Sequence, residues 1–245
     1  MKHSSYIITG PTASGKSDFA HRLARAVNGA IINCDSVQIY RGIENISASP
    51  FAGRAITDEI DGVPYKLFSI LPLDKQISVA DYLNLARREY DNARAAGRTP
   101  IFVGGTGYYI NAIINGISPM PDISDRVRRR ARELVASDID AARRMLPAEF
   151  TATDPQRVAR AVEVFLQTGR HITEFQNAPR AGAIAPDAFR ILINPPLDVL
   201  RGRIATRVPK MLEGGAVTEG RAAISTDCKT PKRRHVVHRK CATMQ

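Results

Sequence analysis

Eight consecutive residues near the amino end have the types and spacing of a phosphate-binding loop. They read GPTASGKS and fit the pattern G-x-x-x-x-G-K-[ST] at every fixed position. Glycines let the backbone curl so that successive N–H groups face phosphate oxygens, while a lysine adds positive charge and a serine hydroxyl is a ligand for Mg²⁺. The pattern predicts binding of a diphosphate or triphosphate, of a nucleotide or of another ester. The residues expected to bind it are Gly10, Pro11, Thr12, Ala13, Ser14, Gly15, Lys16 and Ser17, with Ser17 as the metal ligand.

Asp35 follows an apolar run, 30–34, that is typical of a buried parallel strand. In an open α/β sheet, groups at the carboxyl ends of strands gather around the ligand. A carboxylate in this position can hold Mg²⁺ or accept a proton from an attacking nucleophile, or it can simply cap a helix. The sequence leaves these three roles of Asp35 open.

A later expected strand, 99–103, ends in Gly104-Gly105-Thr106 instead of an acidic residue. P-loop ATPases and GTPases use an acid there to organise Mg²⁺. Small residues allow close approach of the backbone, and the Thr106 hydroxyl could hydrogen-bond a phosphate or a base. The missing acid therefore disfavours a kinase, which remains an alternative because it shares the strand, loop and helix.

Arginines follow the last expected strand, 189–193, on a helix predicted over 197–212. One of Arg201, Arg203 and Arg207 could reach back over the phosphate loop and neutralise charge on a leaving diphosphate. The other interpretation is an ordinary surface arginine.

The elements around these residues predict an α/β fold with a P-loop parallel sheet flanked by helices and a small helical insertion. Strands are expected at 6–9, 63–68 and the runs named above, with a helix after a Ser78 to Asp81 capping box. Arginine-rich helix 125–145 and a helix that begins after Asp154-Pro155 would form the insertion. The predicted parts are core 1–117, insertion 118–182, core 183–218 and tail 219–245.

Composition restricts the class of protein further. The 245 residues carry a formal net charge of +11, which favours a polyanionic partner such as RNA, and the arginines of 125–145 are not matched by acidic residues. Three cysteines without a C-x-x-C pair argue against a disulfide framework and favour the cytoplasm. No stretch is long and apolar enough for a membrane span, so we expect no membrane partner.

Four motifs in order resemble the tRNA dimethylallyltransferase family. They are the loop 10–17, the run DSVQIY at 35–40, the run GGTGYY at 104–109, and Asp154-Pro155 with Arg157, Arg160 and Glu163. The resemblance continues through Arg203, Arg207 and Met211 and covers about 5–218.

The resemblance implies transfer of a dimethylallyl group from dimethylallyl diphosphate to N6 of adenosine 37 in tRNAs that read codons beginning with U. It implies Asp35 as general base, Thr106 near the amino group and the diphosphate, Arg207 with Lys16 and Ser17 on the departing pyrophosphate, and Mg²⁺ as cofactor. The chain would act as a monomer on the anticodon stem-loop. The implied tRNA contacts are Asp35, Ser36, Val37 and Gln38, with Gln156, Arg157, Val158, Ala159 and Arg160.

From Glu219 on, the sequence departs from the family's pattern, and we expect an atypical, basic, disordered tail. The family would continue there with further helices that touch tRNA. A third interpretation is therefore a tRNA-binding remnant that is inactive because those helices are lost.

Overall fold

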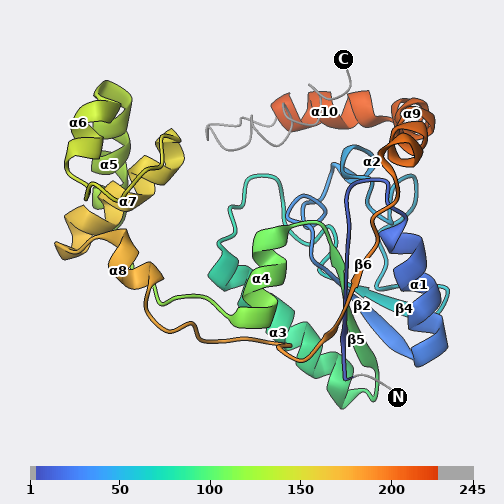
Figure 1. The fold of residues 1–245 in the computed structure, drawn as a ribbon. Helices are drawn as coiled ribbons and strands as arrows, with labels where there is room; N and C mark the ends of the chain where they lie inside the picture. Colours follow the sequence, from blue (N-terminus) through green and yellow to red (C-terminus); the bar gives the residue numbers. More distant parts are fainter. Residues whose placement is uncertain (1–3, 226–245) are drawn as a thin grey trace. The chain divides into compact units, whose positions relative to one another are not determined.

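The computed structural model describes residues 4–225 of the chain (Figure 1). The chain divides into two compact units. The first unit is formed by the residues up to Asn115 together with those from Ala183 onward, and the second is Gly116–Gly182. The predicted insertion, 118–182, lies within the second unit.

Within residues 4–225, six strands form one sheet in the first unit. They are β1 (Tyr6–Thr9), β2 (Gly29–Asn33), β3 (Glu59–Ile60), β4 (Val63–Lys66), β5 (Thr99–Gly104) and β6 (Phe189–Leu192). Their order across the sheet is β3-β4-β2-β5-β1-β6, and every neighbouring pair is parallel except β3 with β4. The predicted fold class, an α/β parallel sheet flanked by helices, is confirmed.

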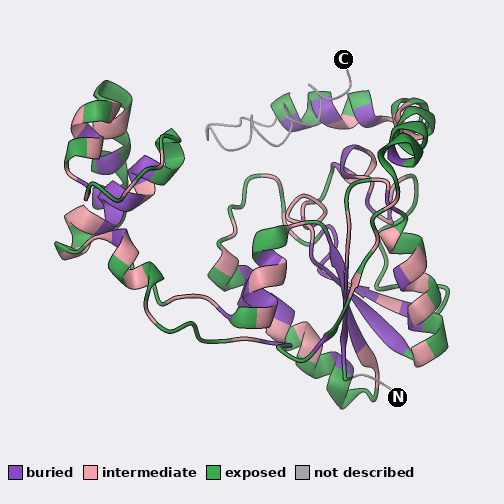
Figure 2. Cartoon of the chain, in the orientation of Figure 1, coloured by how far each residue is buried: buried purple, intermediate pink, exposed green. Residues whose placement is uncertain are grey.

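Helices cover both faces of this sheet. The helices of this unit are α1 (Lys16–Val27), α2 (Glu44–Ser47), α3 (Val79–Ala95), α4 (Gly107–Asn115), α9 (Leu197–Glu213) and α10 (Ala216–Ser225). Of these, α1 packs on one face of the sheet and α3 on the other, α4 packs on α3, and α10 contacts α2 and α9. The side chains of Ile8, Ile31 and Ile101 pack with Ala20 and Ala24 of α1 in one cluster. On the strand period of two, Phe102 points the other way, and its ring stacks on Tyr90 of α3. The central strands are therefore buried on both faces, as Figure 2 shows.

Local signals position these helices. Ser78 and Asp81 form the predicted capping box at the start of α3. Helix α1 ends at Asn28, which adopts the left-handed conformation that its short polar side chain tolerates, and β2 begins directly after it. Because β1, β2, β5 and β6 are parallel, the segments that follow them emerge at the same edge of the sheet. These segments contain the phosphate loop, Asp35, Thr106 and Ile193.

The second unit is helical, with α5 (Asp125–Ser137), α6 (Ile139–Arg144), α7 (Pro155–Thr168) and α8 (Ile172–Gln176) around their own apolar core. The prediction of one helix over 125–145 is wrong. Asp138 is extended, and its carboxylate accepts the N–H groups of Asp140 and Ala141, so it begins a new helix there. A side chain that satisfies two backbone donors competes well with the continuing helix.

The predicted boundary of the tail is also corrected. Its first seven residues, 219–225, lie in α10 and are ordered by contacts described below. The rest of the predicted disordered tail lies outside the described residues. No helix in residues 4–225 is long and apolar enough to cross a membrane.

Candidate active site at the phosphate loop

The loop 10–17 has the backbone geometry that its glycines predict. Gly10 has φ of 159° and Gly15 has φ of 90°, and Ala13 between them is left-handed with φ of 64°. Gly15 is the N-cap of α1 and provides no side-chain cap, so the first N–H groups of the helix keep their capacity to bind an anion. The Lys16 ammonium folds back over the loop and donates to the Pro11 carbonyl at 3.2 Å.

Neighbouring elements hold the loop closely. A Cβ on Gly10 would lie 2.3 Å from the carbonyl oxygen of Ile193, so glycine is required where the loop passes β6. From α9, the Arg203 guanidinium donates to the carbonyl oxygens of Ala13 at 3.2 Å and Ser14 at 2.9 Å. The predicted arginine that reaches the loop is therefore Arg203, and it contacts the loop's backbone.

Asp35 lies in a tight turn after β2 that is fixed on both sides. Its Oδ1 accepts the N–H of Val37 at 2.9 Å, and its own N–H donates to Oδ1 of Asn33 at 2.9 Å. The buried Asn33 amide also donates to the carbonyls of Asp35 and Leu67. The carboxylate thus shapes the turn with one oxygen, while Oδ2 makes no hydrogen bond within residues 4–225.

Thr106 is joined to the same turn. Its hydroxyl accepts the N–H of Ser36 at 2.9 Å and donates to the Ser36 hydroxyl at 3.2 Å, and its N–H donates to the Cys34 carbonyl at 3.2 Å. This approach requires Gly104, because a Cβ there would lie 2.1 Å from the Cys34 carbonyl. In this structure the glycines bring Thr106 against the Asp35 turn, whereas a direct contact with phosphate or base stays a prediction.

Arg207 lies one helical turn after Arg203, on the same side of α9. Burial lowers the pKa of its half-buried guanidinium, and the Asp35 carboxylate opposes that effect, so the two charges lie within electrostatic range. The guanidinium makes no hydrogen bond or salt bridge within the described part of the chain, although arginine keeps its charge. Its donors are therefore available to an anion beside Asp35.

A small cavity, about 10 Å³ in volume, opens next to the loop. Lys16 and Ser17 line one part of it, and the Gln38 side chain another. The remaining lining is mostly apolar and aromatic: Ala20, Ile31, Pro50, Tyr65, Phe68, Val103 and Gly104. Two residues of the predicted phosphate site and a mostly apolar lining thus border one cavity.

The model of the IPP transferase family matches residues 38–242 of this sequence, which is most of its length. The chain belongs to this family. The match continues beyond residue 218, where the resemblance was expected to end.

Relatives of known name agree with this membership. This chain is 37% identical to the tRNA dimethylallyltransferase of Rickettsia felis over 222 residues, which are 87% of this chain and 70% of that protein. It is 38% identical to the tRNA dimethylallyltransferase of Rhizobium etli over 233 residues, 89% of this chain and 75% of that protein.

Solved structures give the same fold. The full-length tRNA isopentenylpyrophosphate transferase of Bacillus halodurans superposes with a TM-score of 0.63 at 29% identity, over 96% of this chain and 74% of that one. A eukaryotic dimethylallyltransferase, described as acting on tRNA, superposes with a TM-score of 0.72 at 24% identity and shows likeness of fold alone. The superposition covers 94% of this chain and 59% of the eukaryotic one.

The second set of predicted tRNA contacts lies in the second unit, at the start of α7. Asp154 accepts the N–H groups of Gln156 and Arg157, whose side chains are exposed. Arg160 is half-buried and pairs with the buried Glu163 at 3.1 Å. The side chains of Val158 and Ala159 are buried in the unit's core, which argues against contacts by these two.

Sequence reasoning missed several features of the residues that organise the site. Asn33 is a polar residue inside an apolar strand, and that exception was the available signal. Arg203 was one of three candidate arginines, but nothing in the sequence indicated that it would bind the loop's carbonyl oxygens. The aromatic lining by Tyr65 and Phe68 gave no signal, because both residues are typical of an ordinary core strand.

Proposed function

We propose that this chain transfers a dimethylallyl group from dimethylallyl diphosphate to N6 of adenosine 37 in tRNAs that read codons beginning with U. The observation that carries the proposal is the cavity beside the phosphate loop. Lys16 and Ser17 face one part of it, and the aromatic rings of Tyr65 and Phe68 line another. A short prenyl chain on a diphosphate needs this combination, since its tail gains from apolar contact and its head from cationic and N–H donors.

The diphosphate head would lie on the loop 10–17. The N–H groups at the start of α1 and the Lys16 ammonium would bind its oxygens, and Arg207 would supply further donors. The buried hydroxyl of Ser14 has no hydrogen-bond partner within residues 4–225, so a bound oxyanion would also satisfy that group. These groups would stabilise the negative charge that develops as the pyrophosphate departs.

The residues present fit Mg²⁺. Ser17 is exposed and offers one hydroxyl oxygen, and no cluster of three or more acidic, histidine or cysteine side chains lies among residues 4–225. Mg²⁺ usually keeps several waters and takes few protein ligands together with substrate phosphates, so a single serine is a sufficient protein donor. When bound, Mg²⁺ would neutralise charge on the diphosphate.

Asp35 would act as the general base. The lone pair of N6 forms a bond to C1 of the donor as the C1–O bond breaks. The pyrophosphate leaves with the electron pair of the C1–O bond. The N6 proton passes to Oδ2 of Asp35, the oxygen that the turn does not use. Thr106 would keep the turn, and with it the base, in place near the amino group and the diphosphate.

The tRNA anticodon stem-loop would be the partner. Adenine must leave its stack to reach Asp35, at a cost of about a few kcal/mol, and protein contacts to the loop would offset this cost. We assign these contacts to Ser36 and Gln38 in the first unit, and to Gln156, Arg157 and Arg160 in the second. We place the reaction in the cytoplasm and expect the chain to act as a monomer.

Donor binding separates this proposal from a kinase. Isothermal titration of the chain with dimethylallyl diphosphate, pyrophosphate and ATP, each with Mg²⁺, should show the prenyl diphosphate binding more tightly than pyrophosphate, because only the former has an apolar group to pack against the apolar residues beside the loop. Preference for ATP, with transfer of its terminal phosphate to the stem-loop, would overturn the proposal. The family comparisons do not favour that alternative.

A further inference from the structure

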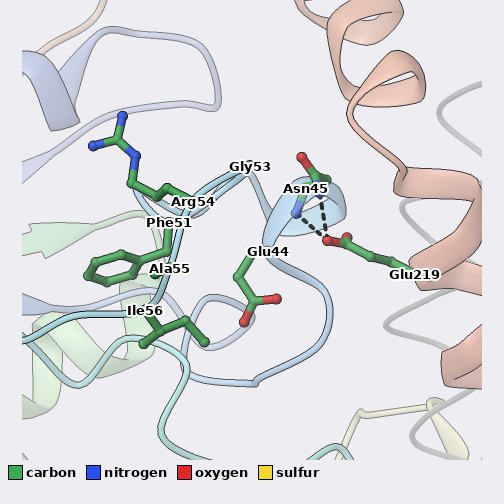
Figure 3. A pocket seen from close by; sticks show the side chains of 8 residues that line it. All are labelled: Glu44, Asn45, Phe51, Gly53, Arg54, Ala55, Ile56 and Glu219. Carbon is green, nitrogen blue, oxygen red and sulfur yellow. Dashed lines mark hydrogen bonds between the residues drawn. The ribbon is translucent and has the colours of Figure 1, made fainter.

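Glu219 of α10 contacts helix α2, which lies far from it in the sequence of the first unit. Its Oε1 accepts the N–H of Asn45 at 2.9 Å and the side-chain Nδ2 of Asn45 at 2.8 Å, and its Oε2 accepts the N–H of Ile46 at 2.9 Å. Figure 3 shows the Glu219 side chain reaching from α10 to Asn45. Both carboxylate oxygens are therefore committed to helix α2.

Helix α2 depends on this contact. It has only four residues, Glu44–Ser47, and its N-cap residue Ile43 provides no side-chain cap. A helix of one turn is unstable alone, because nucleation fixes several residues for one hydrogen bond. A carboxylate that accepts two of its first N–H groups supplies the missing cap and favours the positive end of the helix dipole.

The other end of α2 holds a residue of the candidate site. The Gln38 amide donates to the carbonyls of Ser47 at 3.1 Å and Ala48 at 3.0 Å. Two carbonyl acceptors determine which end of the amide faces them, so the Gln38 Oε1 is left as an acceptor. Since Gln38 lines the cavity with Lys16 and Ser17, the position of α2 sets where that acceptor lies.

Apolar packing links the same helices to the Asp35 turn. Ile43 and Ile46 pack with Ala216 and Ala223 of α10, and Val37 and Tyr40 lie against this cluster; Met211 of α9 also joins it. At the junction of α9 and α10, a Cβ on Gly214 would lie 2.8 Å from the Asn45 Oδ1. The contact thus fixes the end of the helix that carries Arg207.

We infer that Glu219 is a positioning residue of the candidate site, which acts through α2 on Gln38 and the 35–40 turn. The inference rests on the proposed function for its catalytic consequence. Its structural part, the coupling of Glu219 to residues 36–40, stands on the contacts alone. We assign no ligand to a cavity of about 450 Å³ beside this contact, which is lined by Glu44, Asn45, Phe51, Gly53, Arg54, Ala55, Ile56 and Glu219.

The test compares Glu219→Gln with Glu213→Gln. Both variants lose one negative charge, but Glu213 is exposed and forms no hydrogen bond or salt bridge within residues 4–225. Hydrogen exchange should rise on the order of tenfold or more at residues 36–46 in Glu219→Gln and stay unchanged in Glu213→Gln. Faster exchange confined to 45 and 46 would overturn the inference, because Glu219 would then be only a local cap.

Kinetics on the stem-loop provide the second readout. We expect Glu219→Gln to lower kcat roughly tenfold, with a smaller change in KM for the prenyl donor, because the loop 10–17 is untouched. In a double-mutant cycle, the protein with both Glu219→Gln and Gln38→Ala should have a kcat only slightly lower than that of Gln38→Ala alone. Independent, additive effects would contradict the inference. If the wild-type chain transfers no prenyl group, the proposed function fails, and the exchange experiment still decides the role of Glu219.

Discussion

Asp35 shapes its turn with one carboxylate oxygen, and the proposed function gives the other oxygen the role of the base. Oδ1 closes the turn onto Val37, and Oδ2 is left for a proton. The sequence left Asp35 three roles, a Mg²⁺ ligand, a base or a cap, and the structure shows that shaping the turn leaves Oδ2 available for either of the other two. Substitutions that preserve the turn can therefore separate the chemistry from the fold.

Asp35→Asn keeps an oxygen for the Val37 N–H but removes the base. We expect the variant to fold and bind dimethylallyl diphosphate normally, and to lose about 10²-fold to 10⁴-fold in transfer rate. Single-turnover transfer to the stem-loop measures this effect. Asp91→Asn, an exposed change on α3, is the control and should be silent. A fully active Asp35→Asn protein would exclude Asp35 as the base.

Arg203 and Arg207 differ in what they contact, so their removal should have different consequences. Arg207→Gln removes a cation with available donors, and should weaken binding of the diphosphate by about 10-fold to 100-fold, the equivalent of one charge-assisted hydrogen bond. Arg203→Gln breaks two bonds to the loop's carbonyls and should lower the melting temperature, by about 2–4 °C for each kcal/mol of stability removed. Titration calorimetry and thermal unfolding of both variants measure the two effects. Weaker diphosphate binding in Arg203→Gln alone, with a lower melting temperature in Arg207→Gln alone, would contradict the assignment.

Cys34 precedes Asp35 but should be chemically silent. The thiol is fully buried, and burial raises its pKa to about 12. Because the thiolate is the reactive form, Cys34 should resist iodoacetamide in the native protein at every pH below that value and react only after unfolding. Peptide mapping after alkylation at pH 8 measures this, and labelling of native Cys34 would contradict the described burial of the turn.

At the scale of elements, the edge of the sheet is assembled by close approaches that only glycine permits. Gly10 lies against Ile193 after β6, and Gly104 lies against Cys34 after β2. These approaches bring the loop, the Asp35 turn and Thr106 within reach of one another. The sequence motifs showed that small residues stand at these positions. They did not show which backbone each glycine would contact, because that depends on the order of the strands in the sheet.

Two glycines of the 104–107 turn offer a matched test. A Cβ on Gly104 would overlap the Cys34 carbonyl, whereas a Cβ on Gly107 would meet nothing within 4 Å. Gly104→Ala should therefore destabilise the chain by more than about 2 kcal/mol, and Gly107→Ala, at the start of α4, should be neutral or slightly stabilising. Urea unfolding of the two variants checks the difference, and equal stabilities would refute the close approach.

The helices and strands were largely predictable, because local signals carried them. The capping box of α3, the left-handed Asn28 and the Asp154-Pro155 start of α7 fixed their boundaries. The break at Asp138 was missed because the arginines on either side of it, up to Arg132 and from Arg143 on, were assigned to one charged helix. Helix α10 was missed because it is held by a contact with α2, which is distant in the sequence. Such a contact leaves no periodic pattern in the residues of α10 itself.

At the scale of the whole molecule, charge and division into units bear on the partner. The net charge is +11, and the exposed arginines of α5 lie in the second unit, separate in the chain from the phosphate loop. The predicted site residues therefore come from both units. Those of the first unit are brought together around the loop, and those of α7 belong to the other unit.

The α5 arginines should contribute affinity for RNA and leave donor binding unchanged. A variant with Arg126→Gln and Arg129→Gln should bind the stem-loop more weakly and with a shallower salt dependence, by about 0.7 of a unit in the log–log slope for each RNA phosphate that these arginines neutralise. Arg22→Gln with Arg25→Gln on α1 is the control with the same spacing and exposure. Identical salt slopes for the two variants would remove α5 from the RNA-binding surface.

The central claim is prenyl transfer to N6, and the most direct measurement is nucleoside analysis of the RNA product. An unmodified anticodon stem-loop with adenosine 37 is incubated with this chain, dimethylallyl diphosphate and Mg²⁺, then digested and analysed by mass spectrometry. The account predicts N6-dimethylallyladenosine at position 37, and none with Asp35→Ala. Unmodified adenosine from a folded chain that binds the stem-loop would contradict it and leave a tRNA-binding protein without the family's chemistry.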